Sequence, residues 1–221
     1  MTGDARLRVR QDADMTLAAK APEERRRRIL QAAIDVLRAR GFSGTRVADI
    51  AAAAGTSPAL VLYHFSSLGD VLVAALESVD EQYYADLDAA EATDPRDRLV
   101  QMAALAAEGG PAFGDWQLWL EVWVRARHDE RIDKLRRSLD QRWRDELANV
   151  IDVGISLGVL SSQTPKASAV RLAALMDGLA VQVVLDEPLM DPGQMLELWL
   201  DGAALELGTP ASDLRNRVRS T

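Results

Sequence analysis

Cysteine is absent from the 221 residues, and histidine occurs only at His64 and His128. Without cysteine, a disulfide framework, a thiolate nucleophile and a Cys-ligated zinc site are excluded, and two histidines are too few for a multi-histidine metal site. No apolar run approaches the roughly 20 residues that a membrane helix requires, and the N-terminal residues lack the apolar core of a secretory signal. We therefore expect a reduced, soluble, cytoplasmic protein that uses no metal and no other cofactor.

Motifs typical of enzymes are also scarce, since P-loop, dinucleotide and metal-ligand patterns do not occur. The segment Gly154–Gly158 matches the G-x-S-x-G pattern of hydrolases, with Ser156 as the nucleophile. That motif needs a strand-to-helix turn and a histidine later in the chain, whereas this segment ends a predicted helix and both histidines precede it. We expect no enzymatic activity, and an esterase built around Ser156 is the alternative to exclude.

The net charge of −8 is unevenly distributed along the chain. Residues 1–67 contain 11 Lys and Arg against 7 Asp and Glu, whereas residues 68–221 contain 15 against 27. A basic end on an acidic body is typical of a nucleic-acid-binding end attached to a body that does not bind nucleic acid. The alternative is a basic disordered tail that has no partner.

Apolar residues recur with helical spacing through most of the chain, while alternating β patterns and hairpin signals are scarce. Together with the positions of glycine, proline and capping residues, this spacing predicts an all-α fold of about nine helices. They are expected at 22–41, 45–55, 58–64, 68–92, 95–108, 113–128, 130–158, 165–185 and 191–207. The predicted parts are a disordered basic arm at 1–20, a three-helix domain at 21–67, a larger helical domain at 68–208 and a disordered tail at 209–221.

The second and third predicted helices form a helix-turn-helix pattern. Thr45 is expected to cap the second helix, which ends at Gly55, and Ser57 to cap the third, with Pro58 as its first residue. An αα-corner in a bundle core has the same local pattern, but a third helix that ends at His64 buries too little surface to be kept for packing alone. In helix-turn-helix proteins the second helix of the motif enters the major groove of DNA.

The residues of this motif resemble the DNA-binding domain of the TetR family of transcriptional regulators, over about residues 22–75. The resemblance is carried by Gly41–Thr45, Ile50–Ser57 and Tyr63–Phe65. Weaker similarity to the ligand domain of the BetI-like branch is carried by Trp119–Arg127, Arg142–Arg144 and Leu175–Leu179. The resemblance implies an all-helical homodimer that a small molecule releases from operator DNA. The chain departs from the family pattern at Ala59, Leu62 and Leu68, where many members have Gly, Tyr and Lys.

A DNA-binding surface is expected at the N-terminal part of the third helix and around it. Its outward side chains can meet thymine methyl groups or a phosphate, but they offer no bidentate base contact. Four consecutive arginines, Arg25–Arg28, cannot all share one helix face, and we expect either Arg25 or Arg28 to contact phosphate. For His64 the alternative is burial against the fourth helix. The residues predicted to contact DNA are Arg25, Arg28, Thr45, Arg46, Thr56, Ser57, Pro58, Ala59, Leu60, Tyr63 and His64.

A ligand cavity is expected in the acidic body because three tryptophans recur on one face of the sixth predicted helix. Core packing is the alternative for any one of them, although large rings on one stripe also wall apolar ligand sites. A buried Glu121 or Asp177 beside them would favour a cationic ligand. The residues predicted to line the cavity are Met102, Leu105, Trp116, Trp119, Leu120, Trp123, Met176 and Asp177.

A dimer interface is expected on the eighth and ninth predicted helices, because the eighth is apolar almost all round. A helix with two apolar faces has two partners, of which one is its own core and the other a second subunit. Burial of both faces inside one monomer is the alternative. The predicted interface residues are Ala169, Ala173, Met176, Ala180, Val183, Leu198, Trp199 and Leu205.

These observations predict a ligand-responsive transcriptional repressor that binds palindromic operator DNA as a homodimer and is released by a small molecule. The fourth helix belongs to both halves, so it would transmit a displacement from the cavity to the DNA-binding end. The alternative is a helical small-molecule-binding protein that has lost specific DNA binding.

Overall fold

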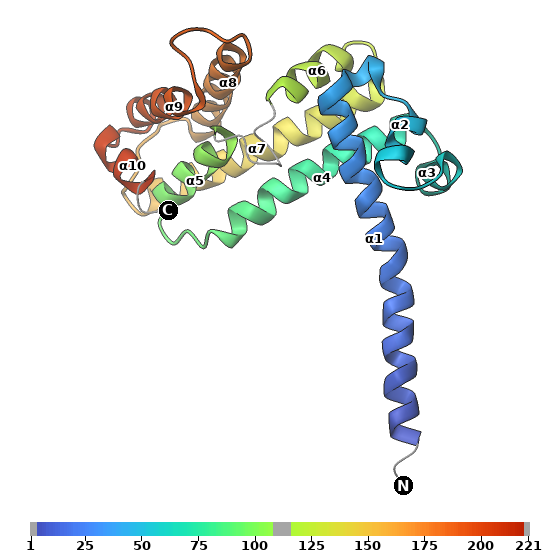
Figure 1. The fold of residues 1–221 in the computed structure, drawn as a ribbon. Coiled ribbons are helices and arrows are strands. Elements are labelled where there is room, and N and C mark those ends of the chain that lie inside the picture. The colour runs from blue at the N-terminus through green and yellow to red at the C-terminus, as the bar shows by residue number, and fades with distance from the viewer. Residues whose placement is uncertain (1–3, 108–115, 219–221) are drawn as a thin grey trace. The chain divides into compact units, whose positions relative to one another are not determined.

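The computed structural model describes the backbone of residues 4–107 and 116–218, and within these ranges the side-chain surroundings from residue 22 onward. Over this part of the chain every regular element is a helix, which confirms the all-α prediction (Figure 1). The helices are α1 (Asp4–Gly44), α2 (Val47–Ala53), α3 (Pro58–Phe65), α4 (Leu68–Ala89), α5 (Pro95–Ala107), α6 (Trp116–Ala126), α7 (Glu130–Ser156), α8 (Pro165–Val184), α9 (Pro192–Leu207) and α10 (Ala211–Val218).

The chain divides into two compact units, residues 1–76 and residues 77–221. The division falls inside α4, close to the boundary at residue 67 that the sequence predicts. In the first unit α1 packs against α2 and α2 against α3, around the buried side chains of Ile29, Leu37, Ile50 and Val61. These are the apolar positions that helical periodicity places on the inner faces.

The first helix begins much earlier than the predicted start at Pro22. Residues 4–21 are helical in the structure, in place of the disorder predicted for them, and Pro22 lies inside α1. These residues contain neither glycine nor proline, so nothing in their backbone chemistry stops a helix that continues toward the N-terminus. The predicted end at Gly41 corresponds to an interruption of α1, where this glycine has φ 66°.

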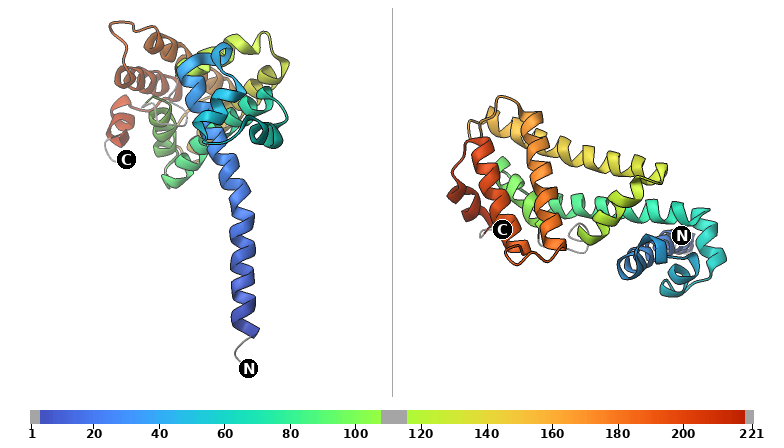
Figure 2. Two further views of the ribbon diagram at one scale, coloured as in Figure 1. Left: turned by 45° about the vertical axis from the view of Figure 1, so that its right-hand side comes forward. Right: turned by 90° about the horizontal axis from the view of Figure 1, so that it is seen from above.

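In the second unit α7 packs against α5, α6 and α8, and α9 packs against α5, α8 and α10 (Figure 2). Trp199 of α9 is completely buried, and its indole Nε1 donates a hydrogen bond of 3.0 Å to the Leu172 carbonyl of α8. The sixth helix starts at Trp116, so residues 113–115 of its predicted range, and the predicted break at 109–111, lie outside the described residues.

The tail predicted to be disordered at 209–221 contains α10, so that prediction is wrong for residues 211–218. Leu214 of α10 is completely buried. Arg217 pairs with Asp97 at 2.5 Å, and Asp213 pairs with Arg96 at 2.8 Å. The polar composition of this segment concealed the helix, because its partners lie on other helices, α5 and α9.

One helix in the described part of the chain, α8, is long and apolar enough to cross a membrane, and the bent pair α3–α4 would be a second at most. The α8 sequence also contains Lys166, Arg171 and Asp177. Because α8 packs against α6, α7 and α9, we assign its apolar side chains to protein contacts.

Gly154 lies inside α7 and is buried against Leu160, which follows the helix. Ser156 is the last residue of α7, and its hydroxyl donates a hydrogen bond of 2.7 Å to the Val153 carbonyl. The segment is therefore a helix end rather than the strand-to-helix turn that a hydrolase nucleophile needs.

Replacing Gly154 by Ala is expected to lower the free energy of unfolding by about 1–3 kcal/mol, because the core cannot accept the extra methyl group without a shift. A Cβ at this position would lie 2.6 Å from Leu160 Cγ and 3.0 Å from its Cβ. Urea denaturation measures the change. Asp152→Ala is the control, because Asp152 is exposed on the same helix and surface substitutions usually change stability by no more than about 0.5 kcal/mol. Equal effects of the two substitutions would contradict the packing argument.

Candidate functional site

The turn between α2 and α3 presents one face of α3 outward. Gly55 has φ 63°, a conformation that favours glycine, and Ser57 caps α3 by accepting a hydrogen bond of 3.2 Å from the Leu60 amide. On the opposite face Val61 and Phe65 are buried in the first unit. The α3 residues left exposed are Pro58, Ala59, Leu62 and Tyr63, and the Tyr63 side chain is 82% exposed.

The arginines of α1 have different surroundings. Arg27 pairs with Glu24 at 2.7 Å, and the Arg26 guanidinium lies over the Phe65 ring at 5.2 Å. Arg28 is exposed and Arg25 is partly buried. Arg46, at the N-cap of α2, is exposed as well. The exposed guanidinium groups of Arg28 and Arg46 therefore remain accessible to phosphate.

Five of the predicted contact residues, Arg25 among them, are buried or partly buried. Thr45 is 4% exposed, and its hydroxyl donates a hydrogen bond of 2.7 Å to the Gly41 carbonyl. The expected cap on α2 is wrong, because Arg46 occupies the N-cap position and makes no side-chain cap. His64 is partly buried, with its Nε2 atom inaccessible and without a hydrogen-bond partner. Thr56 and Leu60 are partly buried, and the others lie at the surface as described above.

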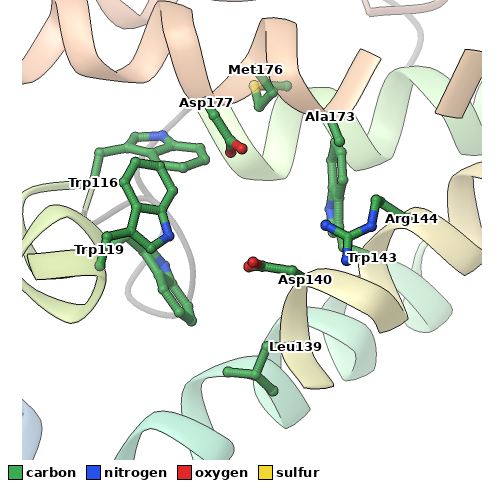
Figure 3. A pocket seen from close by; sticks show the side chains of 10 residues that line it. Trp116, Trp119, Leu139, Asp140, Trp143, Arg144, Ala173, Met176 and Asp177 are labelled. Carbon is green, nitrogen blue, oxygen red and sulfur yellow. The ribbon is translucent and has the colours of Figure 1, made fainter. Parts of the chain in front are cut away.

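The second unit contains a cavity between α6, α7 and α8 (Figure 3). Four tryptophans and two carboxylates converge on it. Figure 3 shows the carboxylates of Asp140 and Asp177 pointing toward each other, with indole rings on either side. The residues lining the cavity are Trp116, Trp119, Trp123, Leu139, Asp140, Trp143, Arg144, Ala173, Met176 and Asp177.

The surroundings of the cavity raise the pKa of both of its carboxyl groups. Burial raises the pKa of the Asp140 carboxyl, although the Arg136 guanidinium, 2.5 Å away, favours its ionised form. Desolvation and the facing carboxylate of Asp140 raise the pKa of Asp177 to about 6, against the opposing effect of Arg144. The residue Asp177 is exposed at the mouth of the cavity, so a ligand can reach its carboxylate from solvent. The cavity therefore combines aromatic walls with negative charge.

Comparison with known families identifies the kind of protein that carries the exposed α3 surface and the tryptophan cavity. Residues 29–75 match the model for bacterial regulatory proteins of the tetR family, and residues 95–208 match that for the C-terminal part of BetI-type transcriptional repressors. The chain belongs to the TetR family. The resemblance seen in the sequence, including its BetI-like C-terminal domain, is confirmed.

Several relatives of this TetR-family chain are similar over most of their length. The HTH-type transcriptional regulator BetI of Brucella suis is 28% identical over 197 residues, which are 86% of this chain and 95% of the relative. A putative transcriptional regulator from Saccharomonospora viridis, solved in complex with choline, has a TM-score of 0.75 and 32% identity, covering 84% of this chain and 98% of the other. A putative TetR-family regulator from Rhodococcus sp. has a TM-score of 0.74 and 28% identity, covering 83% and 98%.

The protein is thus a TetR-family, BetI-type transcriptional repressor and not an enzyme. Regulators of this family bind operator DNA, usually as dimers, and a small-molecule effector. The helix-turn-helix lies in the part of the chain that matches the tetR family, and the tryptophan cavity lies in the part that matches the BetI-type domain.

The structure brings five of the predicted cavity residues of this repressor together and separates the other three. Trp116, Trp119, Trp123, Met176 and Asp177 line the cavity. Met102 is completely buried, and Leu105 lines a different hollow beside α10. Leu120 is partly buried and is not among the lining residues.

Five of the ten residues that line the cavity were not predicted from the sequence. All but one of these five belong to α7. Asp140 and Arg144 looked like members of a solvated charged face, since α7 alternates acids and bases along most of its length. Trp143 lies four residues after Leu139, and this spacing was the available signal that one stripe of α7 is apolar.

The predicted dimer seam of this repressor is wrong for most of its residues, because they are buried within the protomer. The buried members are Ala169, Ala173, Met176, Ala180 and Trp199, each less than 10% exposed. Val183 is partly buried, whereas Leu198 is 45% and Leu205 88% exposed. The core covers this series, and the other apolar series of α8, Leu172, Leu175 and Leu179, is also buried or partly buried within the protomer.

A different face of α8 remains exposed. It carries Val170, Ala174 and Gly178 at successive intervals of four residues, followed by Leu185. The antiparallel neighbour α9 exposes Leu198 and Leu205. We call these six residues the α8–α9 stripe. This face was not singled out from the sequence, because periodicity does not say which apolar residues of a helix the core covers.

Proposed function

We propose that this repressor is a homodimer whose effector is a quaternary ammonium cation of the choline class, bound in the tryptophan cavity. Binding of the cation releases palindromic operator DNA in the cytoplasm. The observation that carries the proposal is the convergence of four indole rings and two carboxylates on one cavity.

The chemistry of the cavity fits a cation that cannot donate hydrogen bonds. A quaternary ammonium group is held by the negative faces of aromatic rings, at about 0.5–2 kcal/mol for each cation–π contact. The Asp177 carboxylate supplies a negative charge at the cavity that a cation would compensate and a neutral ligand would not, whereas Asp140 is already paired with Arg136. The choline complex of the Saccharomonospora viridis regulator supports the same class of effector.

The DNA-binding part of the proposal rests on α3 and the arginines near it. Ser57, Pro58, Ala59 and Tyr63 face outward and suit contacts to thymine methyl groups and phosphate more than bidentate base recognition. Arg28 and Arg46 are the guanidinium groups best placed for phosphate, and Arg25 and His64 remain candidates. Thr45 is not proposed to contact DNA, because it is buried.

The homodimer part of the proposal rests on the α8–α9 stripe. Two adjacent helices that expose apolar side chains suit a two-fold interface in which the same surface is used twice. A Cβ at Gly178 would meet nothing within 4 Å, so a partner helix can approach closely there. A two-fold dimer also presents two recognition helices to the two halves of a palindrome.

Fluorescence anisotropy tests the proposed function. The probe is double-stranded DNA from immediately upstream of the protein's own gene, titrated at several salt concentrations with and without choline. We expect selective binding with a steep negative salt dependence, and weaker binding when choline is added. The neutral analogue of choline, in which carbon replaces the nitrogen, should leave DNA binding unchanged.

Two results would contradict the proposal in different ways. If choline and its neutral analogue act alike, the assigned effector class is wrong. If neither this DNA nor a genome-wide selection shows specific binding, the chain is a small-molecule-binding protein that has lost specific DNA binding.

The affinity for choline is expected to fall as the pH is lowered through about 6, by up to about tenfold per pH unit. The pKa of Asp177 is raised to about 6, so below that pH a proton occupies the carboxylate that attracts the cation. Above it the carboxylate is ionised and the affinity becomes constant. Calorimetric titration between pH 5 and 8 measures the effect, and Asp177→Asn should abolish it. A pH-independent affinity in the unsubstituted protein would contradict this role.

A further inference from the structure

One turn of α7 contacts both the cavity and α4. Trp143 and Arg144 line the cavity, whereas Arg142 and the indole nitrogen of Trp143 reach α4. Trp143 therefore belongs to both contacts, because its ring forms part of the cavity wall while its Nε1 atom is bonded outside the cavity. Any ligand that packs on this ring touches a side chain that is already attached to α4.

Hydrogen bonds connect Trp143 with α4 and α5 through the side chain of Tyr83. The indole Nε1 of Trp143 donates to the Tyr83 hydroxyl at 3.1 Å, and that hydroxyl donates to the Met102 carbonyl at 3.1 Å. Tyr83 is 1% and Trp143 7% exposed, so water cannot replace these bonds without local opening. Burial raises the pKa of the Tyr83 hydroxyl, which therefore keeps its proton and continues to donate.

A second contact fixes the same turn of α7 to the same turn of α4. The Arg142 guanidinium pairs with Asp80 at 2.6 Å and lies over the Tyr84 ring at 3.6 Å. Asp80 is 3% exposed, so this ion pair is also mostly shielded on the α4 side. Neighbouring residues of α7 thus hold neighbouring residues of α4, and the two segments are constrained to move together.

The helix α4 continues without interruption from Leu68 to Ala89, and the boundary between the two units falls inside it. Tyr83 and Asp80 are in the second unit, whereas the first nine residues of α4 are in the first. A helix with continuous backbone hydrogen bonds carries an axial shift or rotation along its length. A displacement imposed at Tyr83 is therefore passed to the residues of α4 that belong to the helix-turn-helix unit.

We infer that Tyr83 is the positioning residue that couples occupation of the tryptophan cavity to α4, through its hydrogen bond with Trp143. A cation that packs against the Trp143 indole shifts this ring, and the Nε1–hydroxyl bond passes the shift to α4. The inference rests on the proposed function and specifies how the effector reaches the DNA-binding unit. Neither a motif nor a charge pattern in the sequence indicates this bond, since its two residues are 60 positions apart.

Tyr83→Phe tests the inference, and the neighbouring residue provides a matched control. The Tyr84 hydroxyl is buried and has no hydrogen-bond partner, so Tyr84→Phe removes the same atom without removing a bond. For each variant and for the unsubstituted protein, anisotropy measures the operator affinity with and without saturating choline. Calorimetry measures the choline affinity of the free protein, and thermal unfolding measures stability.

The informative quantity is the ratio of operator dissociation constants with and without choline, which is commonly about 5- to 150-fold in coupled systems. We expect Tyr83→Phe to reduce this ratio by at least about fivefold, with operator affinity in the absence of choline within about threefold of normal. Tyr84→Phe should keep the full ratio. A merely structural role for Tyr83 would lower the unfolding temperature and leave the ratio unchanged.

The possible results distinguish a failure of the proposed function from a failure of the inference about Tyr83. If choline does not alter operator binding by the unsubstituted protein, the proposed function fails and the inference falls with it. If choline acts normally on that protein and the Tyr83→Phe ratio is unchanged, the inference alone is overturned. Equal losses in Tyr83→Phe and Tyr84→Phe would also overturn it, because the Trp143 bond would then have no special part.

Discussion

Choline should bind at least about tenfold more weakly after Asp177→Asn, and about a hundredfold more weakly when Asp140→Asn is added. Asparagine has nearly the same shape as aspartate, so the change removes charge and leaves the cavity walls in place. A unit charge near a cation contributes a few kcal/mol at partial burial, and the exposure of Asp177 at the mouth reduces its share to about 1.4 kcal/mol, or tenfold. Isothermal titration at pH 7.5 measures both dissociation constants.

Asp152→Asn is the control for these substitutions. It removes the same charge from an exposed position of α7 that does not line the cavity, so choline affinity should stay within about twofold. If Asp177→Asn and Asp152→Asn weaken binding equally, a general loss of negative charge would explain the effect. If neither cavity substitution weakens binding, the cation site lies elsewhere in the protein.

The double substitution Leu198→Arg with Leu205→Arg should convert the protein to a monomer and weaken operator binding by at least about a hundredfold. Charges within an apolar interface are not compensated after association, so the dimer is lost. A monomer holds one recognition helix and engages one half-site of the palindrome, which removes the gain from simultaneous binding. Sedimentation equilibrium measures the mass, and anisotropy measures the operator affinity.

Both leucines are exposed in the protomer, so the fold and the choline affinity should be retained. Val124→Arg is the control, because Val124 is 69% exposed on α6, outside the α8–α9 stripe. It should leave the mass and the operator affinity unchanged. A double variant that stays dimeric would show that the subunits meet on another surface.

Several features of the protein follow from patterns within a few residues of the chain. The helix-turn-helix is one of them, because the capping hydroxyl of Ser57, the positive φ of Gly55 and the proline at Pro58 each act locally. The aromatic face of α6 is another, since helical spacing alone places Trp116, Trp119 and Trp123 on neighbouring positions. These patterns were sufficient to predict the all-α class, the DNA-binding end and one wall of the cavity.

Other features depend on partners that are far away in the chain. The tail looked disordered by composition, but α10 packs against α5 and α9, with Leu214 buried and Arg217 paired with Asp97. The charged stretch of α7 looked solvated, but Asp140 and Trp143 face the tryptophans of α6. Periodicity could not anticipate the helical tail, and for α7 it indicated only that one stripe is apolar, because it describes one helix at a time.

The sequence by itself therefore determined that α8 has two apolar faces, that the chain is all helical and that its basic end has a helix-turn-helix. Only the tertiary structure decided which face of α8 the core covers and which residues complete the cavity. The tertiary structure alone also revealed the bond between Trp143 and Tyr83. The physical reason is that helical propensity and capping are local, whereas burial depends on which surfaces meet after the chain has folded.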